Sequence, residues 1–308
     1  VPTSKLVFKV NGEDKSSALT FTGTDSVRQY TYAGPFVANM IYKFEITATD
    51  AEGIVSTVPV SWDTFKQDNF HIEAEDFNYN SGKYNDNPGI GSLSPYISAI
   101  GTPLIDEYDP VTGGNHDYRP YDTDTQTGEL IATKTMPNEV IRKAYADAYD
   151  NGNGDPLAID YAVGWIDSAT WLNYTRTFPA GTYQMSARIA SSGGYGLRFD
   201  WVTSSPTVAN QTTFPFGTMT GPAVSPGTTE IFGFAPLTDA FGTQVVQRFT
   251  AGVKTMRFNK VSGDVDLNFF QFVSVADPGV LTPYVSSVSP AKGATGIMVR
   301  TLVNFVAG

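Results

Sequence analysis

The sequence has no cysteine, which excludes disulfides, zinc–thiolate sites and thiol catalysis. Histidine is nearly absent too, because only His71 and His116 occur, and they form no paired metal-binding spacing such as H-E-x-x-H. There is also no G-x-S-x-G motif and no glycine-rich phosphate loop. The sequence does not exclude a catalytic pair of carboxylates like that of glycosidases, since 31 acidic residues always offer some pair at a suitable distance. Nothing in the sequence marks such a pair, and we predict that the chain is not an enzyme.

Positive charge is scarce as well. Only 20 lysines and arginines stand against 31 acidic residues, and the formal net charge is -11 at pH 7. Nucleic acids and anionic membranes both bind basic faces, so we expect neither as a partner. No apolar run reaches the roughly 20 residues that span a bilayer, so we expect no membrane span. The sequence begins at Val1 without Met or a signal peptide, which indicates a processed or excised N-terminus.

Glycine, proline and aromatic residues, in contrast, are plentiful. The chain has 29 glycines, 19 prolines and 13% aromatic residues, but only 17% charged residues. This composition is typical of many short strands joined by turns and not of helical bundles. A chain of 308 residues is too long for one ordinary core, so we expect two or three domains. The fold class that follows is all-β.

Two distant stretches each read as one strand, Phe70 to Phe77 (FHIEAEDF) and Val265 to Phe272 (VDLNFFQF). Strand side chains alternate faces, so Glu73 and Glu75 are expected on one face, as are Asp266 and Asn268. If these first and last strands of a domain pair, several oxygen donors share one patch, and such a patch suits calcium. The alternative is that the two glutamates are merely solvated strand residues.

The first segment, residues 1–67, reads as short strands. Apolar and polar residues alternate over 5–10 and again over 42–49, and Asn11-Gly12 supplies a hairpin turn between strands. The segment resembles the later strands of a bacterial immunoglobulin-like repeat. The opening strands of such a domain are missing from it, and an open half-sandwich has bare edges.

The last segment, residues 276–308, supplies what the first lacks. After a linker at 276–279, residues 284–297 and the apolar stretch Leu302 to Val306 resemble the first strand and turn of the same immunoglobulin-like family. Joining Gly308 of one copy to Val1 of the next would complete one domain. We therefore expect residues 284–308 to pair with residues 1–65 of a neighbouring copy, in a tandem array or between subunits. The alternative is an arbitrary cut across two unrelated domains.

The central region, residues 68–275, resembles carbohydrate-binding modules of the family 6 and 35 type, which are jelly-roll β-sandwiches. It departs from them by long insertions at about 85–155 and 203–235, and residues 145–149 of the first insertion are expected in a short helix. Five motifs in the family's order carry the resemblance: IEAEDF at 72–77; YAVGWID at 161–167 with WLNY at 171–174; FPAGTY at 178–183; ARIAS at 187–191; and DLNFF at 266–270.

The resemblance implies a set of site residues. Sugars stack on aromatic faces while polar groups bind their hydroxyls, and the matching positions here are Trp165, Phe241 and Asp264 or Asp266. For Trp165 a core position is the alternative. The family's structural calcium is expected at Glu73, Glu75 and Asn268.

Other aromatic residues are given no binding role by the resemblance. Trp171 matches a tryptophan that is expected in the core. Tyr118, Tyr121, Tyr145 and Tyr149 lie in the first insertion and either wall or block the cleft.

Together these patterns predict a non-catalytic, extracellular or cell-surface module of bacterial type that binds a polysaccharide. It is expected to repeat along a long surface or adhesive protein or fibre. Two alternatives stay open: a stiff filament spacer that has lost its sugar site, and a targeting module of a polysaccharide-degrading enzyme.

Overall fold

A computed structural model describes most of the chain. Side chains are described for residues 5–24, 27–66, 68–86, 100–111, 162–164, 166–224 and 232–279, and the backbone alone for 131–134, 147–148 and 158–161. Two compact units are present, Val1–Lys66 and Gln67–Gly308, here called unit 1 and unit 2. Apart from short 3-10 segments, every regular element in the part of the chain that is described is a strand.

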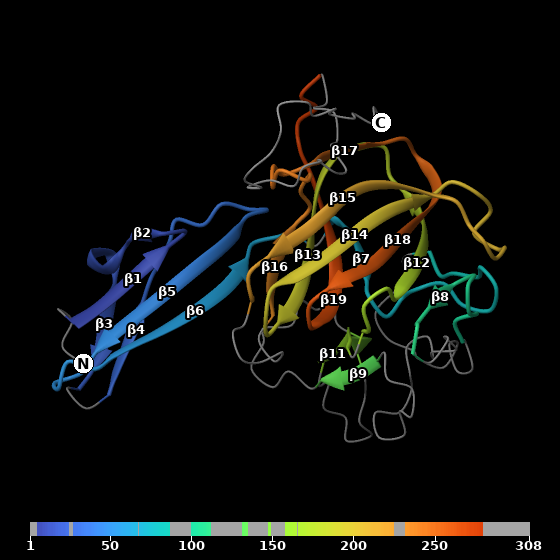
Figure 1. Ribbon diagram of the computed structural model, residues 1–308. Coiled ribbons are helices and arrows are strands. Elements are labelled where there is room, and N and C mark those ends of the chain that lie inside the picture. Colours follow the sequence, from blue (N-terminus) through green and yellow to red (C-terminus); the bar gives the residue numbers. More distant parts are fainter. Residues whose placement is uncertain are drawn as a thin grey trace, which may run out of the picture. The chain divides into compact units, whose positions relative to one another are not determined.

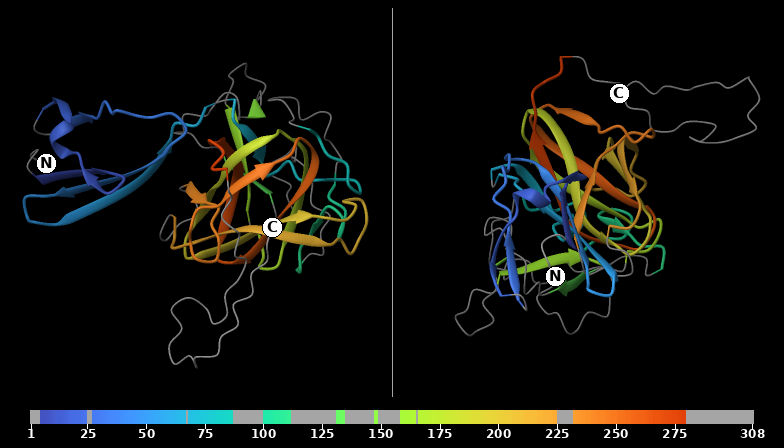
Figure 2. Two further views of the ribbon diagram at one scale, coloured as in Figure 1. Left: turned by 90° about the horizontal axis from the view of Figure 1, so that it is seen from above. Right: turned by 90° about the vertical axis from the view of Figure 1, so that its left-hand side faces the viewer.

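Unit 1 contains a four-stranded antiparallel sheet in the order β2-β1-β5-β6 and a separate hairpin, β3–β4 (Figure 1). The 3-10 helix η2 (Ser16–Ala18) follows β2. The long β5–β6 hairpin is its most extended feature (Figure 2). The strand bounds are β1 Leu6–Val10, β2 Glu13–Asp14, β3 Thr20–Gly23, β4 Arg28–Thr31, β5 Ile41–Thr49 and β6 Val55–Asp63.

The turns of unit 1 follow from local sequence. Asn11 and Gly12 both have positive φ, 51° and 85°, as a two-residue hairpin turn of type I′ requires. They join Val10 to Glu13, which pair across the hairpin. The hairpin predicted at Asn11-Gly12 and the strand predicted at 42–49 are both confirmed.

Unit 2 is a sandwich of two antiparallel sheets (Figure 1). One sheet has the path β10-β11-β19-β13-β16, with β7 beside β19, β9 beside β11 and β17 beside β13; the other is β15-β14-β18-β12-β8. The strand bounds are β7 Phe70–Glu73, β8 Glu107–Tyr108, β9 Ile131–Lys134, β10 Asp147–Ala148, β11 Ala158–Val163, β12 Trp171–Phe178, β13 Gly181–Ser191, β14 Tyr195–Val202, β15 Thr213–Gly221, β16 Gly233–Pro236, β17 Val246–Phe249, β18 Gly252–Ser262 and β19 Val265–Ser274.

The core of unit 2 lies between these two sheets. Alternate residues of β12, β13, β14, β18 and β19 point inward, and many are aromatic. Phe270, for example, is fully buried and its ring lies 5.1 Å from Tyr174 and 5.4 Å from Phe199, which come from the opposite sheet. The all-β sandwich predicted from composition and motifs is confirmed.

The first and last strands of the sandwich pair as predicted, but the first is shorter than expected. β7 runs antiparallel to β19, with Phe70 opposite Phe272 and Glu73 opposite Phe269. It ends at Glu73, because the chain then turns and the Asp76 N–H donates to the Glu73 carbonyl at 3.2 Å. The alternation expected across Phe70 to Phe77 therefore stops before Glu75.

The short helix predicted at 145–149 is wrong over its described part. Asp147–Ala148 is a strand that pairs with Ile159 and Ala158 of β11. The backbone N–H and C=O groups there take cross-strand partners, which is incompatible with a helix at the same residues.

Candidate functional site

The acidic residues after β7 lie inside unit 2 and not on its surface. Glu73 is 8% exposed, Glu75 1% and Asp76 2%. The Tyr174 hydroxyl donates to the carbonyl of Ala74 at 2.8 Å. Burial raises the pKa of Tyr174 well above its usual value, and the negative charge of Glu75 raises it further. This end of the sandwich is therefore a buried, negatively charged region.

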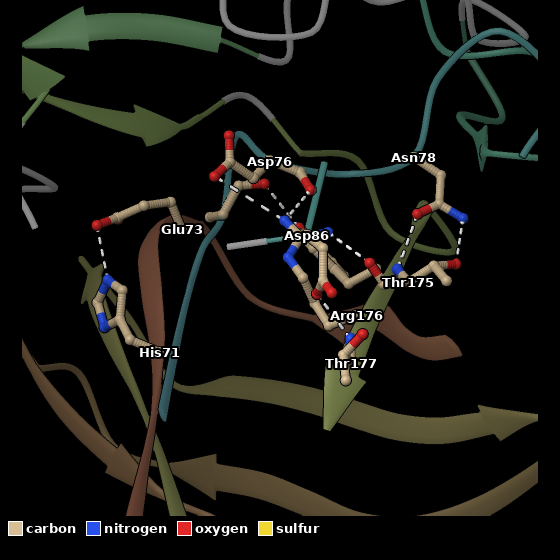
Figure 3. A network of polar contacts seen from close by, with 10 residues as sticks. His71, Glu73, Asp76, Asn78, Asp86, Thr175, Arg176 and Thr177 are labelled. Carbon is tan, nitrogen blue, oxygen red and sulfur yellow. Dashed lines mark hydrogen bonds and ion pairs between the residues drawn. The ribbon is translucent and has the colours of Figure 1, made fainter. Parts of the chain in front are cut away.

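Arg176 supplies positive charge to this region from β12. Its guanidinium is 1% exposed, and it donates to the carbonyl oxygens of Asp76 at 2.6 Å and Thr175 at 2.7 Å. One nitrogen lies 3.9 Å from the Asp76 carboxylate (Figure 3). Nearby, Asn78 Nδ2 donates a hydrogen bond to Thr175 Oγ1 at 2.8 Å. The acidic turn is thus tied to β12 by polar contacts.

Two of the three predicted metal ligands already bind protein N–H groups. Glu73 Oε1 lies 2.6 Å from the His71 ring nitrogen Nε2 (Figure 3). Asn268 Oδ1 accepts a hydrogen bond from Arg188 at 2.7 Å. A cation bound through both oxygens has to displace the His71 ring and the Arg188 guanidinium, so these two contacts must open before an ion binds there.

The strand register also separates the predicted ligands. Arg188 pairs with Phe269 and Ile189 with Leu267, so Asn268 sits at a bulge that interrupts the alternation expected from Asp266 onward. Over the described ranges, no group of three or more acidic or histidine side chains is placed to hold a metal ion.

A second polar cluster lies at the turn between β18 and β19. Lys260 is 7% exposed, and its ammonium donates to the carbonyl of Ile166. Burial lowers the pKa of Lys260, while Asp264, Asp167 and Asp266 oppose that shift through their negative charge. Asp264 is exposed and accepts a hydrogen bond from Ser192 at 3.1 Å.

Gly164 brings the preceding loop against this cluster. A Cβ on Gly164 would come 2.9 Å from Asp266 Oδ1, so only glycine lets the backbone approach the carboxylate this closely. Trp165 itself lies outside the described residues, but both of its chain neighbours touch the cluster: Gly164 through Asp266, and Ile166 through Lys260. We call Gly164, Ile166 and Asp167 together with Lys260, Asp264 and Asp266 the turn site.

Phe241 lies in a different part of unit 2. It is 43% exposed in the loop between β16 and β17, and its N–H donates to Asp239 Oδ1 at 2.9 Å. That loop pairs with β15 through Thr238 and Thr218, whereas Asp266 pairs with Ala190 near the end of β13. The structure gives Phe241 neighbours other than those of the turn site.

The outer face of the sheet β15-β14-β18-β12-β8 carries a cluster that the sequence reasoning missed. Trp171 is half-buried there and not in the core, and the guanidinium of Arg257 lies 3.7 Å from its ring centre. Arg257 donates to Asn173 Oδ1 at 3.0 Å and also to Gln211. Burial lowers the pKa of Arg257 to about 10, although the charge of Asp200 opposes this.

The core position predicted for Trp171 is therefore wrong. Leu172 and Tyr174 of the same strand point inward, so strand alternation alone places Trp171 on the other face. The family resemblance favours a core position for Trp171, whereas strand alternation predicts the correct face.

The remaining predicted positions lie outside the described residues. These are the insertion tyrosines Tyr118, Tyr121, Tyr145 and Tyr149, and the C-terminal residues 280–308. No helix within the described ranges has the length and hydropathy needed to cross a bilayer.

Neither a protein-family model nor a curated protein matches this sequence. Solved structures do match. A family 6 carbohydrate-binding module from Clostridium stercorarium, in complex with cellobiose, matches at 19% identity over 38% of this chain and 76% of its own, with a TM-score of 0.28. A carbohydrate-binding module from Cellvibrio mixtus lichenase 5A, in complex with cellotriose, matches at 18% identity over 56% and 99%, with a TM-score of 0.31.

The chain is similar to family 6 carbohydrate-binding modules. This is the family whose motifs the central region resembles. A third match is a glycoside hydrolase family 43 arabinoxylan arabinofuranohydrolase from Bacillus subtilis, in complex with cellotetraose. It matches at 12% identity over 76% of this chain and 38% of its own, with a TM-score of 0.33.

Proposed function

We propose that this chain is a non-catalytic extracellular module that docks a polysaccharide at the turn site. The observation that supports the proposal is the close approach of the Gly164 backbone to the Asp266 carboxylate, where an added Cβ would come 2.9 Å from Oδ1. It brings the loop that carries Trp165 to the same end of the sandwich as two aspartates and a buried lysine. Sugar recognition needs an aromatic face and polar groups that bind hydroxyls, and this loop carries Trp165 in sequence while Asp264 is exposed at the same turn.

The binding mechanism divides between stacking and hydrogen bonding. The Trp165 ring provides an apolar face for the C–H groups of a pyranose ring. Asp264 is exposed and accepts hydrogen bonds from sugar hydroxyls, while Lys260 fixes the loop backbone through the Ile166 carbonyl. Phe241 offers an exposed ring on a separate loop and serves as a second, weaker platform.

Replacing Trp165 with alanine should abolish most glycan binding. We expect retention of the wild-type chain on an affinity gel and a dissociation constant at least tenfold higher for Trp165→Ala, a loss of about 1.4 kcal/mol or more. Cellobiose and cellotriose, the ligands of the two similar modules, are the first soluble probes. Asp264→Asn should weaken binding less, and Phe241→Ala least.

Phe21→Ala is the matched control, because it removes an aromatic ring that is 49% exposed in unit 1. It should bind as the wild type does. A wild-type chain that is retained on no glycan overturns the proposal and favours the spacer function.

We further propose that a structural calcium ion stabilises unit 2 through Glu73, Glu75 and Asn268, although two of these side chains must first release their protein donors. The donors are carboxylate and amide oxygens, which calcium prefers. The ion supplies charge compensation in this acidic region and takes part in no reaction.

Chelator should then lower the thermal unfolding midpoint of unit 2. A ligand that binds only the folded state stabilises by roughly 3 kcal/mol at a hundredfold excess over its Kd. Calorimetry with and without chelator measures the shift, and Asn268→Ala should reduce it. An identical midpoint in chelator contradicts the calcium proposal.

The proposal extends to a repeated surface protein. Copies of the module would be arranged along an adhesive protein or fibre, with unit 1 completed as an immunoglobulin-like domain by residues 284–308 of a neighbouring copy. The alternation in unit 1 and the apolar C-terminal stretch support this arrangement.

A further inference from the structure

Unit 1 has an apolar sheet face that its own residues cover only in part. Paired residues of an antiparallel sheet share a face, and the register places one apolar set together. The opposite face is mostly polar. The apolar face is formed by Leu6, Phe8, Val10, Tyr42, Phe44, Ile46, Ala48, Val58, Val60 and Trp62.

Only the part of this face on β1 and at the start of β5 is covered. Phe8, Val10 and Tyr42 are buried, and Leu19, Tyr32, Phe36 and Phe44 pack against them. These residues form a small cluster for a unit of this length, which ordinarily needs a larger apolar core to be stable.

The part of the face that β6 contributes is exposed together with Ile46 of β5, although the Trp62 ring lies 4.9 Å from that of Phe36. Ile46 is 37% exposed, Val58 52%, Val60 43% and Trp62 47%. These four residues, here called the apolar stripe, are contiguous, because Ile46 pairs with Val58, and Val60 and Trp62 follow at alternate positions. A contiguous apolar patch of this kind marks an interaction surface.

The apolar stripe lies next to an open sheet edge, which is the free edge of β6. In the described part of the chain β6 pairs only with β5, so its other edge faces no strand. β6 contains Pro59, a residue found in sheets mainly on edge strands, which removes one donor and leaves the others. An edge with N–H and C=O groups beside an apolar face accepts an added strand.

Residues 284–308 have the composition of the missing strand. They contain the apolar stretch Leu302 to Val306, and they include Lys292 and Arg300 but no acidic residue. Unit 1 has six lysines and arginines against seven acidic residues over residues 1–66, so its charge is close to neutral and does not repel this segment. The repeat assembly proposed above supplies this segment to the stripe from a second copy.

We propose that residues 284–308 of a second copy dock on the apolar stripe and that Leu302–Val306 add a strand to the free edge of β6. This inference names the acceptor surface for the repeat assembly and rests on that part of the proposed function, not on glycan binding. Each copy then carries one donor and one acceptor surface, so copies associate head to tail.

Sedimentation velocity of the full chain over a range of concentrations tests the proposal. We expect the wild type to self-associate, and Val58→Lys or Val60→Lys to raise the dissociation constant at least tenfold. Val253→Lys is the matched control, because Val253 is a 59% exposed valine on β18 of unit 2, and it should associate as the wild type does. A monomeric wild type, or unchanged association of both lysine variants, overturns the proposal.

Cysteine cross-linking gives an independent readout, since the chain has no cysteine of its own. Val60→Cys chains mixed with Phe305→Cys chains should form a mixed disulfide, whereas Val253→Cys chains mixed with Phe305→Cys chains should not. An equal yield in both mixtures, or an internal disulfide formed in dilute solution by one chain carrying both cysteines, overturns docking by a second copy. Glycan retention of Val60→Lys should match the wild type, so failure of this inference and failure of glycan binding are distinguishable.

Discussion

Phe178→Ala is expected to destabilise unit 2 by about 3–5 kcal/mol, the usual cost of truncating a buried phenylalanine. Phe178 is fully buried at the end of β12. Its ring centre lies 4.9 Å from that of Phe70, 5.2 Å from Trp201, 5.3 Å from Phe249 and 5.9 Å from Phe272. These rings come from both sheets, so the substitution leaves a cavity where the two layers meet.

Urea denaturation followed by tryptophan fluorescence measures this loss. Trp201 lies edge-on to Phe178 and reports on the same cluster. With an m-value of about 2–3 kcal/mol/M, the unfolding midpoint should fall by about 1–2 M. Val253→Ala is the control, because this exposed valine lies opposite Thr177 on the outer face, and its truncation should cost under about 0.5 kcal/mol. A loss below about 1 kcal/mol for Phe178→Ala would show that the two sheets do not depend on this cluster.

The second large effect is expected for Arg176→Met, which should also cost about 3–5 kcal/mol. Methionine fills similar space but donates no hydrogen bond. The carbonyl oxygens of Asp76 and Thr175 lose their guanidinium donors, and the buried Asp76 carboxylate loses its neighbouring positive charge. An uncompensated buried charge is the larger part of such a loss.

Two further variants separate charge burial from packing. Arg176→Met combined with Asp76→Asn should regain part of the lost free energy, because the amide carries no charge. Arg248→Met removes an exposed ion pair with Asp277, at 2.5 Å, and should cost under about 1 kcal/mol. If Arg176→Met alone and Arg176→Met with Asp76→Asn lose the same free energy of unfolding, the effect of Arg176 comes from packing alone.

Pattern and turn chemistry predicted much of the fold. Alternating apolar residues predicted β5, and Asn11-Gly12 predicted the β1–β2 turn, because these signals act over a few residues. The pairing of β7 with β19 was also predicted, although about 200 residues separate the two strands. The family motifs at both strands carried that information.

The strand positions of the candidate metal ligands show where reasoning from strand periodicity fails. Glu73, Glu75 and Asn268 were placed on common faces by assuming unbroken strands. The turn after Glu73 and the bulge at Asn268 break that periodicity, and neither leaves a clear local signal. The donors supplied by His71 and Arg188 depend on which strands lie side by side.

The amino-acid sequence by itself determined that this protein is an all-β chain with a sandwich bounded by its own first and last strands, because strand periodicity and turn residues act locally. Only the tertiary structure decided which polar groups meet. It brought the Gly164 backbone close to the Asp266 carboxylate and the Arg257 guanidinium onto the Trp171 ring. It also placed Phe241 in a separate loop, where its N–H donates to Asp239. The physical reason is that a side chain's partners depend on the register and stacking of strands distant in sequence, and one residue of bulge or turn reverses the face it occupies.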